Sequence, residues 1–107
     1  MAWVYIPLPR ACVYLLRAEN GYVKIGASFR PQYRAMSIGG MSPIPVTLIG
    51  AWDVQSARET ERKLHSYYAP LHVKNEWFDL GDSHLRELIT WLDRIGTRAT
   101  DDKVQRE

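Results

Sequence analysis

The sequence predicts an α+β fold, a small three-stranded and mainly antiparallel sheet flanked by helices in the order β-β-α-β-α-α. Three observations lead to this fold class. Two apolar segments flank a glycine-containing turn near the N-terminus, a third apolar segment follows a proline-rich turn, and two later segments have the apolar spacing of helices. A chain of 107 residues has room for one domain with one modest core.

The first two apolar segments are expected to form a hairpin, with strands at residues 12–16 and 22–27. A three-residue loop that ends with Gly21 in a left-handed conformation suits the Glu-Asn-Gly sequence between them. In this register the aliphatic residues of both strands share one face: Val13, Leu15, Val23 and Ile25. Tyr14 and Lys24 share the other face. A two-residue Asn-Gly loop would shift the register by one residue and mix the faces, so the three-residue loop is preferred.

The middle of the chain is predicted to form two helices around a third strand. A helix capped by Ser28 should run to about residue 38 and end at Gly39-Gly40. The third strand covers residues 46–54. Ser56 begins a capping-box pattern that opens a helix over residues 57–69. The following segment, LHVKNE, is expected to be a loop.

The last helix is capped by Asp82 or Ser83 and stops at Gly96. Its apolar residues form one amphipathic stripe: Leu85, Leu88, Ile89, Leu92 and Ile95. We expect residues 1–97 to form a single domain and the polar residues 98–107 to form a disordered tail.

The composition says more about the cellular compartment of the protein than about the reaction it performs. Cys12 is the single cysteine, which rules out an internal disulfide and is typical of a reducing cytoplasm. The N-terminal segment lacks the basic start and long apolar run of a signal peptide, and no apolar stretch has the length of a membrane span. We therefore expect a cytoplasmic protein without a membrane partner. The net charge of +2 is compatible with a phosphate-bearing partner but does not require one.

Two segments carry the candidate chemistry. In VYLLRAENGYVKIGASFRPQYR, Tyr14 ends a Cys-Val-Tyr triplet, Gly26 ends a Lys-Ile-Gly triplet, and Arg34 follows eight residues later. This stretch resembles the N-terminal half of GIY-YIG nuclease domains, whose two triplets and helical arginine have this order. The later ARETERKLHSYYAPLHVKNEWF resembles the second half of a compact, single-domain branch that has KIG at the YIG position and ends in EWF. The resemblance covers residues 12–78 and maps the metal-binding glutamate of the family to Glu61.

The resemblance implies a metal-dependent endonuclease that hydrolyses phosphodiester bonds in DNA with Mg²⁺ or Mn²⁺, RNA not being excluded as a substrate. Members of this superfamily often depend on an appended targeting domain. We therefore expect weak sequence preference here, unless a homodimer or a targeting partner supplies it. Two alternatives stay open: a catalytically inactive nucleic-acid-binding module with the same fold, and a protein-interaction adaptor, for which the sequence has no specific sign.

The residue types suit the chemistry independently of the resemblance. Tyr14 and Lys24 are diagonal neighbours on one face, and Arg34 can contact a phosphate through two parallel hydrogen bonds. A carboxylate such as Glu61 can hold a hard cation. Glu61 lies in register with three apolar or aromatic residues of its helix: Ala57, Leu64 and Tyr68. A carboxylate on such a core-facing stripe needs an arginine, a metal or both, unless the stripe is shallow and Glu61 only rims it.

Each candidate also has a plain structural interpretation. Tyr14 suits any sheet, and Lys24 and Arg34 suit a solvated surface. Lys24 stands where the best-known family members have tyrosine, and a desolvated lysine with a lowered pKa would serve as a general base. His65, one turn after Glu61, is either a proton shuttle or phosphate ligand, or a partly buried structural histidine.

A further set of cations is predicted to track phosphates around the cleft, the alternative being simple solvation: Arg30, Arg58, Arg62 and Lys63. Asn75 lies near the position of the last conserved asparagine of the family.

Overall fold

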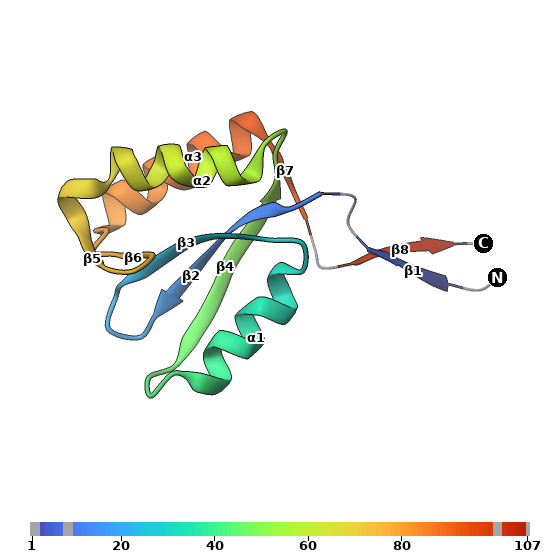
Figure 1. Cartoon of the computed structure of the whole chain (residues 1–107), viewed down its shortest axis with the longest axis horizontal. Coiled ribbons are helices and arrows are strands. Elements are labelled where there is room, and N and C mark those ends of the chain that lie inside the picture. Colours follow the sequence, from blue (N-terminus) through green and yellow to red (C-terminus); the bar gives the residue numbers. More distant parts are fainter. Residues whose placement is uncertain (1–2, 8–9, 100–101, 107) are drawn as a thin grey trace.

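The computed structural model describes residues 3–7, 10–99 and 102–106, and the side chains of residues 10–99. A central sheet separates helix α1 on one face from helices α2 and α3 on the other (Figure 1). In chain order the elements are β1 (Trp3–Pro7), β2 (Cys12–Ala18), β3 (Val23–Ser28), α1 (Pro31–Met41), β4 (Val46–Asp53), α2 (Ala57–Tyr67), the 3-10 turn η1 (Ala69–Leu71), β5 (His72–Lys74), β6 (Trp77–Phe78), α3 (Asp82–Ile95), β7 (Thr97–Arg98) and β8 (Asp102–Arg106). The predicted α+β class and the β-β-α-β-α-α order of the major elements are confirmed.

The predicted hairpin is confirmed with its register. Tyr14 pairs with Gly26 and Leu16 with Lys24. The Gly21 amide donates to the Ala18 carbonyl, and Gly21 has a φ of 95°, the left-handed conformation that a three-residue loop requires.

Two apolar clusters fill the two sides of the sheet. The first joins the predicted aliphatic face to α2 and α3, through Val13, Leu15, Val23 and Ile25 with Leu64, Leu88 and Leu92, all buried. The second lies under α1 and contains Cys12, Tyr14, Leu16 and Ala51, with Ile38 and Trp77 packed against it. The hairpin therefore presents one face to each cluster, as its alternating pattern predicts.

The sheet is larger than the three predicted strands. All neighbouring strands are antiparallel, in the order β5-β6-β3-β2-β4-β7. The segment LHVKNE, predicted as a loop, contains β5 and leads into β6. These two strands have three and two residues, too few to show a period in the sequence.

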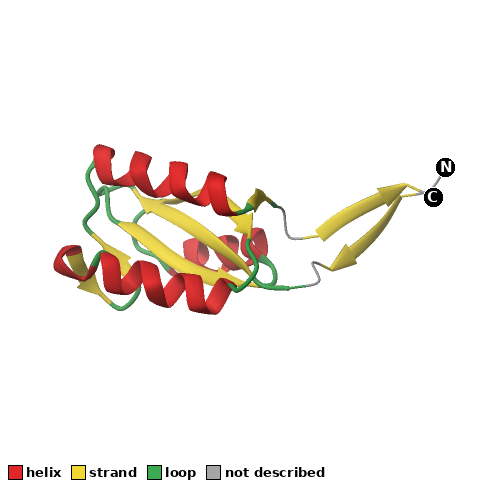
Figure 2. Cartoon of the chain, turned by 90° about the horizontal axis from the view of Figure 1, so that it is seen from above, coloured by secondary structure: helices red, strands yellow, loops and turns green. Residues whose placement is uncertain are grey.

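Two further strands fall in the C-terminal segment, where the sequence predicts none. Strand β7 pairs with β4. Strand β8 pairs with β1 from the other end of the chain, so that both ends share a separate two-stranded ribbon (Figure 2). Long-range pairing of this kind leaves no local signal. Among the described residues, no helix has the length and apolarity needed to cross a membrane.

The predicted ends of the first two helices need correction. Helix α1 continues through Gly39 and Gly40 to Met41. Ser42 stops it, because the residue before a proline disfavours the helical conformation. Ser28 accepts a hydrogen bond from the Arg30 amide just before the helix but does not cap it. Ser56 occupies the N-cap position of α2, yet its side chain makes no capping hydrogen bond, so the predicted capping box is not formed.

Candidate active site at the edge of strand β3

Gly26 makes room for the side chain of Tyr14 to lie across strand β3. Tyr14 is 1% exposed, and its ring lies over the backbone of its cross-strand partner Gly26. A β-carbon on Gly26 would overlap the ring and the hydroxyl. The missing side chain therefore lets the phenol pass over strand β3. Its hydroxyl comes near enough to Glu61 and Glu76 for both carboxylates to affect the tyrosine pKa.

Substitution of Gly26 tests this packing. We expect Gly26→Ala to lower the free energy of unfolding by about 1–3 kcal/mol, the usual cost of overpacking a core. Gly81→Ala is the matched control, because a β-carbon there has no neighbouring atom within 4 Å and its φ of −73° suits alanine. Urea denaturation of both variants measures the difference. Equal stabilities would show that the Tyr14 ring moves aside freely.

Lys24 and Glu76 form an ion pair whose lysine side chain is buried and whose carboxylate is partly exposed. The Lys24 ammonium donates to Glu76 Oε2 at 2.8 Å, and Lys24 is only 7% exposed. Burial raises the pKa of Glu76, but the hydrogen bond and charge of Lys24 outweigh burial, so its pKa lies below the ordinary value. Glu76 is therefore favoured as a carboxylate, and the Lys24 side chain is engaged as its hydrogen-bond donor.

The turn between β5 and β6 places Glu76. Asn75, with a φ of 52°, adopts the left-handed conformation that asparagine tolerates in tight turns. The Glu76 carbonyl then accepts from the Ile25 amide at 3.1 Å, which joins the turn to strand β3. The structural role of Asn75 is thus to shape the turn that carries Glu76.

Glu61 faces the sheet from α2, on the predicted stripe. Its Oε2 atom is buried and has no hydrogen-bond partner among residues 10–99. Burial, followed by the charge of Glu76 and a hydrogen bond to it, raises the pKa of Glu61, while His65 and Arg58 oppose the shift. Two carboxyl groups can bond only through a shared proton, and Lys24 neutralises Glu76. Glu61 is therefore the carboxyl group of the pair whose protonated form the folded protein favours.

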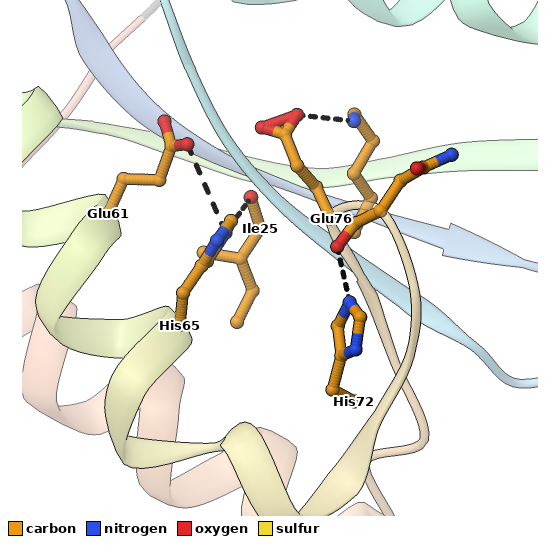
Figure 3. A network of polar contacts seen from close by, with 7 residues as sticks. Ile25, Glu61, His65, His72 and Glu76 are labelled. Atoms are coloured by element: carbon orange, nitrogen blue, oxygen red, sulfur yellow. Dashed lines mark hydrogen bonds and ion pairs between the residues drawn. The ribbon is translucent and has the colours of Figure 1, made fainter.

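His65 joins α2 to the same point of β3. Its Nε2 lies 2.8 Å from the Ile25 carbonyl oxygen and 4.0 Å from Glu61 Oε1 (Figure 3). Because a carbonyl only accepts, Nε2 must carry a proton in this contact. Glu61, His65 and Glu76 can offer ligand atoms within 4.8 Å of one another. These three residues therefore form a possible metal-binding group, in which Nε2 of His65 is not the ligand atom while it donates to Ile25.

Arg34 reaches the site from α1. Burial first raises the pKa of Tyr14, and the side-chain hydrogen bond and positive charge of Arg34 lower it, with a net rise. Tyr14 is therefore a neutral phenol at neutral pH, beside an arginine that is itself exposed to solvent. The site thus draws Tyr14 and Lys24 from the sheet, Arg34 from α1, Glu61 and His65 from α2, and Glu76 from the β5–β6 turn.

The predicted phosphate-tracking residues separate into two groups. Arg30, Arg58 and Arg62 are exposed, and the charge of Arg58 is felt by Glu61. Lys63 lies about 200° around the helix axis from Glu61 and lines a groove between α2 and α3. It is therefore directed away from the site.

Glu76 is the site residue that the sequence reasoning missed. Glu76 is the glutamate of the EWF motif. The segment that contains it was predicted to be a loop, so its side chain could not be placed relative to the sheet.

Comparison with known families agrees with this architecture. The family model of the T5orf172 domain matches residues 11–96.

The chain belongs to the T5orf172 domain family.

This family is GIY-YIG-like, in accord with the resemblance of residues 12–78. No curated protein and no solved structure gives a significant match to the chain. The T5orf172 domain covers every residue of the candidate site, from Tyr14 to Glu76.

Proposed function

We propose that this T5orf172 domain is a metal-dependent endonuclease that hydrolyses phosphodiester bonds in DNA. The buried Oε2 atom of Glu61, without a hydrogen-bond donor among the described side chains, is the observation that carries the proposal. A buried acceptor without a partner is costly, and native proteins rarely retain one without a functional reason. A second carboxylate and three groups suited to phosphate chemistry lie beside it.

The donor set fits a hard divalent cation such as Mg²⁺ or Mn²⁺. Such ions prefer carboxylate oxygen and are often held by one or two carboxylates plus water. Glu61 and Glu76 would supply those oxygens, which come from an α-helix and an anchored turn. Held by these two carboxylates, such a cation would polarise a phosphoryl oxygen of the substrate and offset its charge.

The remaining residues have roles that follow from their contacts. Arg34, exposed and beside Tyr14, would hold the phosphate through two hydrogen bonds and stabilise the negative charge that increases in the transition state. The neutral hydroxyl of Tyr14 would orient the attacking water. Lys24 positions Glu76, and His65 positions strand β3 against α2. The best-known members of the GIY-YIG family have tyrosine at the position of Lys24. In this chain the lysine instead holds a second acidic group, Glu76, at the site.

Cleavage of supercoiled plasmid tests the proposal. With Mg²⁺ or Mn²⁺ we expect nicked and linear products, and with EDTA we expect none. Plasmid that is bound but never cut with either ion would favour the alternative of an inactive nucleic-acid-binding module.

Binding to nucleic acid is expected to be weak and strongly dependent on salt, because the candidate contacts are to phosphates. Arg30→Ala and Arg62→Ala should each lower the slope of log Kd against log salt by about 1, the effect of one lost phosphate contact. Lys63→Ala should leave it unchanged, since Lys63 lies in the α2–α3 groove. Fluorescence anisotropy in EDTA separates binding from cleavage. A slope near zero for the unaltered protein would contradict this electrostatic account.

A further inference from the structure

A groove of about 630 Å³ lies at the end of the sheet, on the side covered by α1. It forms where the β2–β3 turn, the end of α1 and the β5–β6 hairpin meet. Its walls include Tyr22, Ile38, Met41, Lys74, Asn75 and Trp77. None of the residues discussed as candidate catalytic groups lines it.

The groove is lined by sequence and cross-strand neighbours of the candidate active-site residues. Trp77 is the cross-strand partner of Lys24. Ile38 follows Arg34 by one turn of α1, and both Ile38 and Trp77 pack against the cluster that contains Tyr14. From Gly26 to Lys24 the strand advances only about 7 Å, at about 3.3 Å per residue. A nucleic acid held at Arg34 can therefore reach this groove with a neighbouring unit.

The residues that line the groove indicate which kind of polymer it would bind. Tyr22 and Trp77 are aromatic and half-buried, and Met41, at the end of α1, is 83% exposed. Lys74 is the single charged residue among the lining residues that the structure describes, so the groove carries positive charge and no acid. Aromatic surfaces stack on nucleobases, methionine adapts to flat apolar groups, and an ammonium suits a phosphate backbone.

We propose that this groove holds the nucleobase next to the phosphate that is cut, so that the preferred substrate is a DNA strand unpaired on that side. A paired base is stacked on both faces inside a duplex and enters a side groove only after extrusion from the helix. Single-stranded tails, flaps and frayed ends lack most of that cost. The inference deepens the proposed nuclease function and rests on it for the position of the cut phosphate.

Binding in EDTA tests the inference without cleavage. The probes are a short single-stranded DNA and the blunt duplex of the same sequence, each with one 2-aminopurine. We expect tighter binding of the single strand and quenching of its 2-aminopurine fluorescence by stacking. Met41→Glu should weaken single-strand binding at least about fivefold, because one stacked base contributes at least ~1 kcal/mol. Met36→Glu is the matched control, on the same helix, 75% exposed, with the same change of charge and outside the groove lining.

A second variant removes the aromatic wall. Trp77→Leu keeps an apolar side chain against the core and should abolish the quenching, whereas Trp91→Leu on α3 should not. Equal binding by the Met41 and Met36 variants, or equal affinity for single strand and duplex, would overturn the inference. If plasmid were still cut in either case, only the nucleobase groove would be lost. Absence of binding to both probes together with absence of cleavage would overturn the proposed function as well.

Discussion

Glu61→Gln is expected to lower the rate of plasmid cleavage at least ~100-fold, more than the loss of a residue that only supports a metal ligand. The same variant is expected to melt at the same or a higher temperature than the unaltered protein in EDTA. Glutamine keeps the shape of glutamate and has no proton to lose, so it never places a second negative charge beside Glu76. Its amide can donate to Glu76 at every pH, whereas Glu61 can do so only while it keeps its proton. A stabilisation of about 1 kcal/mol would match relief of one unsatisfied buried acceptor.

The raised pKa of Glu61 predicts how its contribution to folding stability changes with pH. The pKa of Glu61 is raised in the folded state, so at pH values above its ordinary value of 4.5 the unfolded chain loses the proton first. In EDTA, the contribution of Glu61 to stability therefore falls as pH rises from about 4.5 through the raised pKa, and is constant above it. Glu61→Gln removes this fall. Glu76 acts in the opposite direction, because its lowered pKa contributes stability that is lost as pH falls below its ordinary value.

Thermal melts in EDTA across this pH range and plasmid cleavage with Mg²⁺ measure both parts of the prediction. Glu59→Gln is the matched control, since Glu59 is exposed on the same helix and makes a long 3.8 Å pair with Lys63. It should change neither cleavage nor stability appreciably. A Glu61→Gln variant that cuts normally would contradict the proposed mechanism. A loss of about 3–5 kcal/mol would instead identify Glu61 as the structural partner of a buried cation.

Arg34→Ala is expected to reduce the single-turnover cleavage rate roughly 100- to 1,000-fold, the usual cost of removing one group that stabilises transition-state charge. Affinity for uncut DNA should fall much less. The reason is that Arg34 is proposed to act mainly on charge that develops during the reaction. Its exposure on α1 predicts little change in folding stability. Arg34→Lys should restore only part of the rate, because an ammonium cannot make the two parallel contacts of a guanidinium.

Arg62→Ala serves as the comparison, because Arg62 is exposed on α2 and is assigned to phosphate tracking. It should weaken binding and leave the single-turnover rate at saturating protein nearly unchanged. Single-turnover cleavage and anisotropy in EDTA, both at fixed salt, separate the two effects. Equal losses of rate and affinity in Arg34→Ala would show that Arg34 only positions the DNA.

The sequence by itself determined the centre of this protein. The turn chemistry at Gly21 set the register of β2 and β3, and alternation then placed Tyr14 and Lys24 on the face opposite the aliphatic core. Helical spacing put Glu61 on the buried side of α2. These are local or periodic properties, and each is carried by a few neighbouring residues.

Only the tertiary structure decided how that centre becomes a site. Glu76 reaches the site from a turn between two very short strands. Its low pKa depends on the hydrogen bond from Lys24, which is 52 residues away in the chain. Gly26 lets Tyr14 approach both carboxylates only because the two strands pair. His65 is restricted by a carbonyl of β3, and Lys63 points to a different groove. These contacts join segments that are far apart in the sequence and have no common hydrophobic periodicity. They are determined by long-range packing, which a local sequence pattern does not encode.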